Sequence, residues 1–149
     1  MPSHLNILLV EDDDVDVMTV RRALTGARVD HDLTVHRTGG DALAWLRDAA
    51  RADAGPLPDV LILDLNLPLL SGLELLESVK KIPALAAIPA VVLTTSGQES
   101  DVARAFELGA AGYFVKPVDF DRFVAVMGTL CRYWSMSALS HPPAGKVRS

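Results

Sequence analysis

The sequence predicts an α/β fold in which a five-stranded parallel sheet lies between two layers of helices. Short apolar runs bounded by proline or polar residues predict strands that are buried on both faces, and the clearest is Val60–Leu63, between Pro58 and Pro68. Five such runs alternate with five segments of helical periodicity, as repeated βαβ units require. Right-handed crossovers of this length give a three-layer sandwich, for which we adopt the flavodoxin-like strand order 2-1-3-4-5.

The first half of the chain supplies two strands and two helices. A strand at Leu5–Val10 leads into four consecutive carboxylates, residues 11–14, and the last two of these we interpret as charges that favour the start of a helix. That helix is predicted over residues 15–27. A short strand over residues 33–35 has polar neighbours, so we expect it towards an edge of the sheet, and a second helix follows over residues 39–52.

The second half begins with the central strand Val60–Leu63. Ser71 and Glu74 have the spacing of a capping box and predict the start of a helix that Pro83 ends. The remaining predicted elements are a strand over residues 90–95, a helix over 99–108, a strand over 113–115 and a last helix from a cap at Asp119 to about residue 137. We assign residues 1–138 to one folded domain and residues 139–149 to a flexible C-terminal tail.

Size and composition limit the possible partners. The 149 residues are half hydrophobic with a net charge of −5, and the 14 Lys and Arg residues form no basic run that would bind nucleic acid. Cys131 is the single cysteine, so we expect it in the core rather than in a disulfide. We find neither a signal peptide nor an apolar run of roughly 18 residues, and therefore expect a cytoplasmic protein that does not bind membranes.

Polar groups follow four of the five predicted strands. They are residues 11–13 after the first strand, Asp64 after the third, residues 94–96 after the fourth and Lys116 after the fifth. The carboxyl ends of parallel strands lie at one edge of the sheet, where ligands bind. Carboxylates gathered there repel one another unless a cation compensates, and hard oxygen ligands favour Mg²⁺. A lysine and a hydroxyl at the same edge suit a phosphoryl group, so we predict a site that places Mg²⁺ and phosphate against a carboxylate nucleophile.

Four motifs in this order resemble the receiver domain of two-component response regulators, the CheY-like domain, over residues 5–134. They are residues 8–13 (Leu-Leu-Val-Glu-Asp-Asp), 63–68 (Leu-Asp-Leu-Asn-Leu-Pro), 93–96 (Leu-Thr-Thr-Ser) and 113–117 (Tyr-Phe-Val-Lys-Pro). Within this family the chain is most similar to the small stand-alone regulators that partner bacterial and cyanobacterial phytochromes. Residues 64–68 and 93–96, the loop before the central strand and the pair Tyr133-Trp134 suggest that subgroup.

The resemblance implies a metal site built around the phosphoacceptor Asp64. Asp12 would bind Mg²⁺ directly, together with Asp64 and the backbone carbonyl oxygen of Asn66. Glu11 would act on the metal through a water molecule.

The resemblance also implies how a phosphoryl group is held and sensed. Thr94 would donate a hydrogen bond to it and Lys116 would pair with it. Tyr113 would be the aromatic switch that turns inward when Thr94 moves. The bond between Lys116 and Pro117 is expected to be cis by analogy with the family, at a cost of about 0.5–1 kcal/mol.

The predicted function is therefore that of a signalling protein, not an enzyme. A sensor histidine kinase, for which the resemblance suggests a phytochrome, would donate the phosphoryl group, and the output would be an altered protein–protein contact. One alternative is a HAD-like carboxylate-nucleophile phosphohydrolase, but such enzymes have a second Asp two residues after the nucleophile, where this chain has Asn66. Another is a small flavodoxin, whose phosphate loop would be replaced here by carboxylates that repel phosphate.

The last predicted helix has an unusually broad apolar face, which predicts a homodimer. An apolar stripe a little over ~100° wide is enough to cover one side of a sheet. We expect the flank formed by Val126, Leu130, Tyr133 and Trp134 to face outward and to bind a second copy of the chain. The alternative is a well-buried helix that the C-terminal tail covers.

Overall fold

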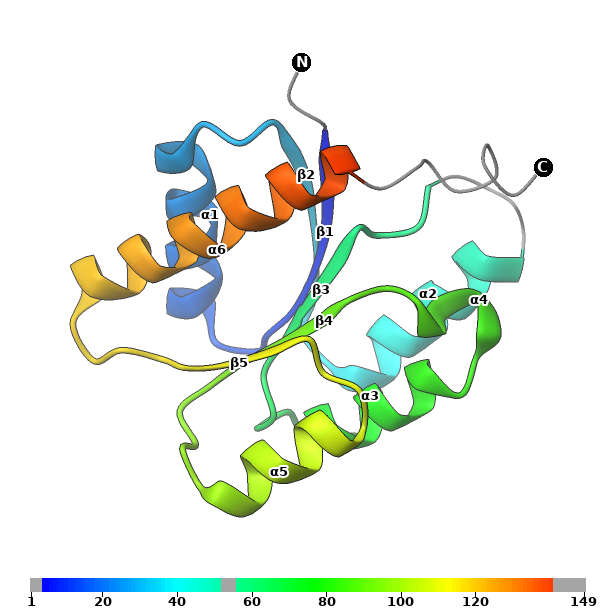
Figure 1. Cartoon of the computed structure of the whole chain (residues 1–149). Coiled ribbons are helices and arrows are strands. Elements are labelled where there is room, and N and C mark those ends of the chain that lie inside the picture. The colour runs from blue at the N-terminus through cyan, green and yellow to red at the C-terminus, as the bar shows by residue number, and fades with distance from the viewer. Residues whose placement is uncertain (1–3, 52–55, 141–149) are drawn as a thin grey trace.

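A five-stranded parallel sheet forms the centre of the computed structural model, which describes residues 4–51 and 56–140 (Figure 1). The strand order is β2-β1-β3-β4-β5, which confirms the predicted flavodoxin-like layout. All four strand pairings are parallel. The strands are β1 (Leu5–Val10), β2 (His31–His36), β3 (Val60–Leu63), β4 (Ala90–Thr94) and β5 (Gly112–Val115).

Helices cover both faces of the sheet, as predicted. Figure 1 shows α1 and α6 together on one face and the other helices on the opposite face. The helices are α1 (Asp14–Ala27), α2 (Gly39–Arg51), α3 (Gly72–Lys80), α4 (Pro83–Ala86), α5 (Glu99–Glu107) and α6 (Phe120–Ser140). The described chain thus has six helices where we expected five, because α3 ends at Lys80 and Pro83 begins the additional single turn α4. Proline at the first position of a helix needs no N–H partner there.

The sheet separates two hydrophobic cores. Leu8 and Val10 of β1 face the core shared with α2, α3, α4 and α5. Ile7 and Leu9, the alternate residues, face the core shared with α1 and α6. All four residues of β3 are buried, which confirms that this central strand has no solvent-exposed face.

Side-chain caps explain where α1 and α3 begin. Asp13 caps α1 by accepting hydrogen bonds from the backbone N–H groups of Val15 and Asp16. The capping box of Ser71 and Glu74 is present at the start of α3, as predicted. Asp13 therefore acts at the start of a helix, as we interpreted it.

The edge strand and the ends of the chain differ slightly from the sequence-based boundaries. β2 runs over His31–His36, longer than the three residues expected, and it is an edge strand because it pairs with β1 alone. Helix α6 extends to Ser140. Residues 141–149, most of the predicted tail, lie outside the described residues.

The predicted outward flank of α6 is wrong at Leu130. This side chain is only 5% exposed and packs in the core with Phe123, Met127 and Cys131. Leu130 follows Met127 by three residues, so the two share the face that α6 turns towards α1 and the sheet. Tyr133 is 62% exposed, and Trp134 is half-buried with its ring edge-on to that of Tyr133.

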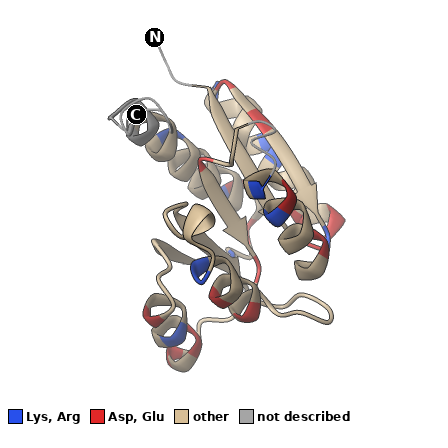
Figure 2. Cartoon of the chain, turned by 90° about the vertical axis from the view of Figure 1, so that its right-hand side faces the viewer, with Lys and Arg blue, Asp and Glu red and all other residues tan. Residues whose placement is uncertain are grey.

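The positions of the basic residues (Figure 2) and the hydropathy of the helices agree with the sequence analysis. In Figure 2 the Lys and Arg residues are spread over separate elements of the described chain rather than gathered in one patch. Among the helices in the described part of the chain, none combines the length and the apolar composition that a bilayer crossing requires.

Candidate functional site

The carboxyl ends of β1, β3, β4 and β5 meet at one edge of the sheet and bring the predicted site residues together. Glu11 follows β1, Asp64 follows β3, Thr94 ends β4 and Lys116 follows β5. Glu11 and Asp64 are 1% and 5% exposed, and Thr94 is fully buried. Side chains so far apart in sequence meet because the parallel register aligns the strand ends.

Lys116 is the cation at the centre of this site. Its ammonium group donates to Glu11 Oε1 at 2.7 Å, to Asp16 Oδ2 at 2.6 Å and to Asp64 Oδ2 at 3.0 Å. Burial alone would lower the pKa of Lys116, but the bonds to Asp16 and Glu11 outweigh it and raise the pKa above its ordinary value. The side chain is therefore a permanent positive charge, with each of its three N–H groups on a carboxylate.

Asp64 is an ionised carboxylate that faces this cation. Burial opposes its ionisation, but the Asn66 backbone N–H, at 3.1 Å from Oδ1, and Lys116 more than compensate. The pKa of Asp64 is consequently held below its usual range. An unprotonated oxygen is what a carboxylate nucleophile needs.

Glu11, Asp12 and Asp64 form a group that could hold a metal ion. Each offers a carboxylate oxygen, and these atoms lie within 4.8 Å of one another. Burial raises the pKa of Glu11 to about 7 despite its bond to Lys116, so a nearby divalent cation would favour its ionised form. Two buried carboxylates and one exposed carboxylate fit a hard cation that retains some of its water.

Asn66 and Tyr113 contact the residues at and after the end of β4. The side-chain amide of Asn66 is 3.4 Å from Thr94 Oγ1 and 3.4 Å from Thr95 Oγ1. Tyr113 donates its hydroxyl to the backbone carbonyl of Ser96 at 2.6 Å. Thr94 accepts from the backbone N–H of Ser96 at 3.5 Å, so the two predicted switch residues, Thr94 and Tyr113, both contact Ser96.

Gly72 lets α3 begin directly against the segment that follows β3. Its backbone N–H donates to the Leu65 carbonyl at 3.1 Å. A Cβ at this position would lie 2.1 Å from the Asp64 carbonyl oxygen and 2.7 Å from Leu65 Cα. Only glycine allows so close an approach without moving the backbone that holds Asp64.

Two features of the site differ from expectation or were missed. The bond between Lys116 and Pro117 is trans, since no peptide bond among the described residues is cis. A tertiary amide favours trans by only about 0.5–1 kcal/mol, so analogy alone was a weak guide. Asp16 was not predicted as a site residue, although it makes the shortest contact with Lys116.

A signal for Asp16 existed in the helical pattern. It lies four residues before Val20 and seven before Ala23, both of which are buried on α1. A carboxylate on the buried face of a helix needs a partner. Asp14, in contrast, is exposed and forms an ion pair with Arg37 on the surface.

Comparison with known proteins shows the same family as the motifs. Residues 7–127 match the response regulator receiver domain. The response regulator Rcp1 of Synechocystis sp. is 41% identical over 123 residues, which cover 82% of this chain and 84% of Rcp1.

Solved structures of similar proteins agree along most of the chain. The phosphorylated cyanobacterial phytochrome response regulator RcpA is 31% identical with a TM-score of 0.84, over 96% of this chain and 100% of that one. The Mn²⁺-bound form of Rcp1 is 36% identical with a TM-score of 0.81, over 88% of this chain and 94% of that one. The bacteriophytochrome response regulator AtBRR is 36% identical with a TM-score of 0.70, over 91% of this chain and 94% of that one.

Proposed function

The chain belongs to the response regulator receiver domain family and is related to phytochrome response regulators, and from this premise we propose that Asp64 is its phosphoacceptor. The observation that supports this most directly is the ionised Asp64 carboxylate, which pairs with Lys116 beside a group of metal-binding oxygens. A nucleophile, a cation for the phosphoryl oxygens and hard oxygen ligands are the parts that phosphoryl transfer to a carboxylate requires.

The proposed reaction is transfer from a phosphohistidine of a sensor kinase. A carboxylate oxygen of Asp64 attacks the phosphorus, the P–N bond breaks, and its electron pair leaves on the imidazole nitrogen of the donor, which then takes up a proton. Lys116, which donates to Asp64, and the Thr94 hydroxyl, which helps to lower the pKa of Asp64, would hold the new phosphoryl oxygens. Catalysis here amounts to positioning and to electrostatic stabilisation.

Mg²⁺ is the metal we propose for the acidic group. Asp12, Asp64 and the backbone carbonyl of Asn66 would bind it directly, and Glu11 would act through a water molecule. When bound, the ion would offset the negative charge of the phosphoryl oxygens and of Asp64. The solved Mn²⁺-bound form of Rcp1 supports a divalent metal in a relative.

We propose that the donor is a phytochrome-type histidine kinase, because RcpA, Rcp1 and AtBRR are among the similar proteins. The protein would then act in the cytoplasm, and its output would be a protein–protein contact that changes when Thr94 and Tyr113 shift together. The phosphohydrolase alternative is not supported by the family match, and Asn66 cannot serve as its general acid.

A homodimer joined through α6 also remains a proposal, now without Leu130. Tyr133 is exposed on α6, and Val126 and Trp134 are each partly exposed on the same helix. A half-buried Trp beside an exposed Tyr is a typical composition for a protein–protein contact.

Phosphorylation with acetyl phosphate and Mg²⁺ tests the proposed function. We expect one phosphoryl group by intact mass, and its loss in hydroxylamine, as for acyl phosphates. Asp64→Asn should not be labelled, whereas Asp48→Asn, which removes an exposed carboxylate on α2, should be labelled like the wild type. Labelling of Asp64→Asn at the wild-type level would exclude Asp64 as the acceptor. Profiling against phytochrome-type and other sensor kinases then identifies the donor.

A further inference from the structure

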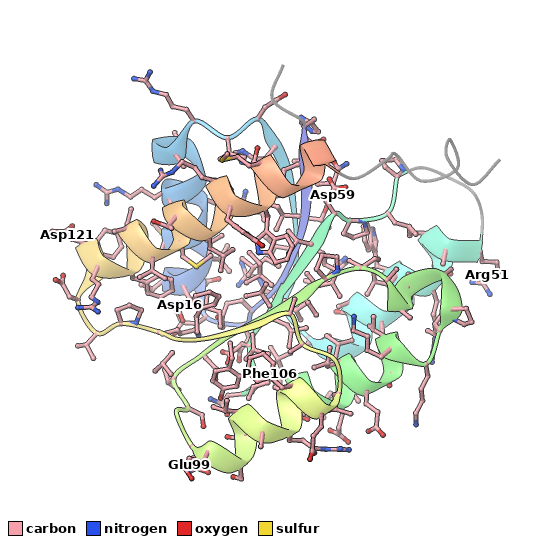
Figure 3. All side chains as sticks on the ribbon, viewed as in Figure 1. Asp16, Arg51, Asp59, Glu99, Phe106 and Asp121 are labelled. Carbon is pink, nitrogen blue, oxygen red and sulfur yellow. The ribbon has the colours of Figure 1, made fainter. Side chains whose placement is uncertain are left out.

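Lys116 is held by one carboxylate that lies outside the acidic group. Of its three partners, Glu11 and Asp64 belong to the group that could hold a metal ion, and Asp16 does not. Asp16 also makes the shortest contact, at 2.6 Å. In Figure 3, Asp16 is labelled at the start of α1, beside the segment that leads from β5 to α6.

Asp16 is itself held in a fixed position. It lies in the first turn of α1, where its backbone N–H donates to Oδ1 of the cap residue Asp13 at 3.2 Å. Its side chain is 18% exposed, and that of Lys116 is 7% exposed. A charge-assisted hydrogen bond between two fixed and largely buried groups is short and strong.

The three carboxylates do not stay equivalent during the proposed reaction. A metal ion would engage oxygens of Glu11 and Asp64, and phosphorylation would change the Asp64 carboxylate, one oxygen of which now accepts from Lys116. Asp16 is the partner that neither event engages. Its bond to Lys116 can therefore persist through metal binding and phosphorylation.

From this we propose that Asp16 is a positioning residue, which anchors the ammonium group of Lys116 by a hydrogen bond so that its remaining N–H groups meet the phosphoryl oxygens. The inference rests on the proposed role of Asp64 as the phosphoacceptor and adds a residue to that site. Asp16 touches neither the reacting carboxylate nor the phosphoryl group and acts through Lys116.

The test compares variants of Asp16 with a matched variant on the same turn. Asp16→Ala removes the acceptor, and Asp16→Asn removes the charge but keeps an oxygen that can accept from Lys116. Asp14→Asn makes the same change of charge two residues away, at an exposed side chain whose ion pair is with Arg37. Thermal unfolding first verifies that each variant folds, and Asp16→Ser, which is too short to reach Lys116, replaces Asp16→Ala if that variant does not fold.

The first measurement is the affinity for beryllofluoride in saturating Mg²⁺, by calorimetry. We expect Asp16→Ala to raise the Kd about tenfold, as for loss of one hydrogen bond to a charged group. Asp16→Asn should restore most of that affinity, and Asp14→Asn should match the wild type. Mg²⁺ affinity without beryllofluoride should change less than beryllofluoride affinity, whereas a merely structural defect would weaken both.

The second measurement follows Lys116 itself in protein labelled with ¹⁵N-lysine. The ammonium protons of Lys116 should be protected from exchange and give an NMR signal in the wild type and in Asp16→Asn, and lose it in Asp16→Ala. An unchanged signal and unchanged beryllofluoride affinity in Asp16→Ala would overturn the inference, as would equal losses in both Asp16 variants. If the wild type itself does not bind beryllofluoride, the proposed function fails, and the Lys116 signal still tests the anchor.

Discussion

Lys116 offsets the repulsion among carboxylates that the parallel sheet brings to one edge. Its removal should leave Glu11, Asp16 and Asp64 buried without a counter-ion. We expect Lys116→Met to lower the free energy of unfolding by about 3–5 kcal/mol, the usual result of breaking a buried ion pair. Because Mg²⁺ can supply the missing charge, the midpoint of thermal unfolding should rise more with Mg²⁺ in the variant than in the wild type. Equal effects of Mg²⁺ on both proteins would contradict this.

Cys131 gives a prediction about reactivity. Burial raises the pKa of its thiol to about 12, so the thiolate that reacts with disulfide reagents is scarce at neutral pH. A thiol-specific reagent should modify the folded protein much more slowly than the protein in guanidinium chloride, where one thiol should react at once. Complete modification of the native protein within the mixing time would show that Cys131 is accessible.

At the scale of single residues the sequence predicted the site residues at the ends of strands but missed Asp16, in the first turn of α1. Asp64, Glu11, Thr94 and Lys116 could be placed at one edge because a parallel sheet aligns strand ends. Asp16 was missed because it lies beyond the acidic run of residues 11–14, inside the predicted helix, although its spacing from buried Val20 indicated an inward carboxylate.

The start of α3 depends on a glycine because of close packing, not because of an unusual backbone angle. In Gly72→Ala the new Cβ would meet the Asp64 carbonyl oxygen at 2.1 Å, so the connection after β3 must move. We expect a loss of about 1–3 kcal/mol in stability, as for overpacking, and slower phosphorylation by acetyl phosphate.

Gly26→Ala is the control for that variant, because a Cβ at Gly26, inside α1, meets no atom within 4 Å. Alanine there should stabilise the protein by up to about 1 kcal/mol, since it favours the helix. Similar destabilisation by the two substitutions would show that packing against Asp64 is not the cause.

The turn that follows α4 depends on hydrogen bonds from Lys80 of α3, which the helical and strand patterns of the sequence do not reveal. Its ammonium group donates to the carbonyls of Ala86 at 2.9 Å and of Ile88 at 3.0 Å, and burial lowers its pKa. We expect Lys80→Met to cost about 1–3 kcal/mol in urea unfolding, because these carbonyls lose their donor. Lys81→Met should cost at most about 1 kcal/mol, since its ion pair with Glu77 is exposed. Equal costs would mean that Lys80 does not stabilise the turn.

At the scale of the whole molecule, periodicity predicted the layers correctly but not how deeply each helix is buried. The alternation of short apolar runs with helical segments required βαβ units, so the three layers followed. The apolar arc of α6 was attributed partly to a second copy. In the structure the apolar side of α6 packs in one core with α1 and the sheet, and Leu130 is part of that core. Contacts between segments far apart in the sequence decide which neighbour covers a helix. The apolar pattern of one helix carries no information about those contacts.

The proposed homodimer is therefore tested at Tyr133, the exposed residue of the predicted flank, and Leu130 serves as a buried comparison. Tyr133→Asp places a charge at a 62% exposed position of α6 and should turn a dimer into a monomer, with only the small fall in the midpoint of thermal unfolding that loss of the dimer contact causes. Leu130→Asp should instead lower that midpoint, because it buries an unpaired charge. Ala44→Asp adds the same charge to an exposed position of α2, on the other face of the sheet, and should leave the assembly unchanged. Sedimentation velocity at tens of micromolar, with and without acetyl phosphate, measures the assembly state of the wild type and of each variant. A monomeric wild type in both conditions would exclude the dimer.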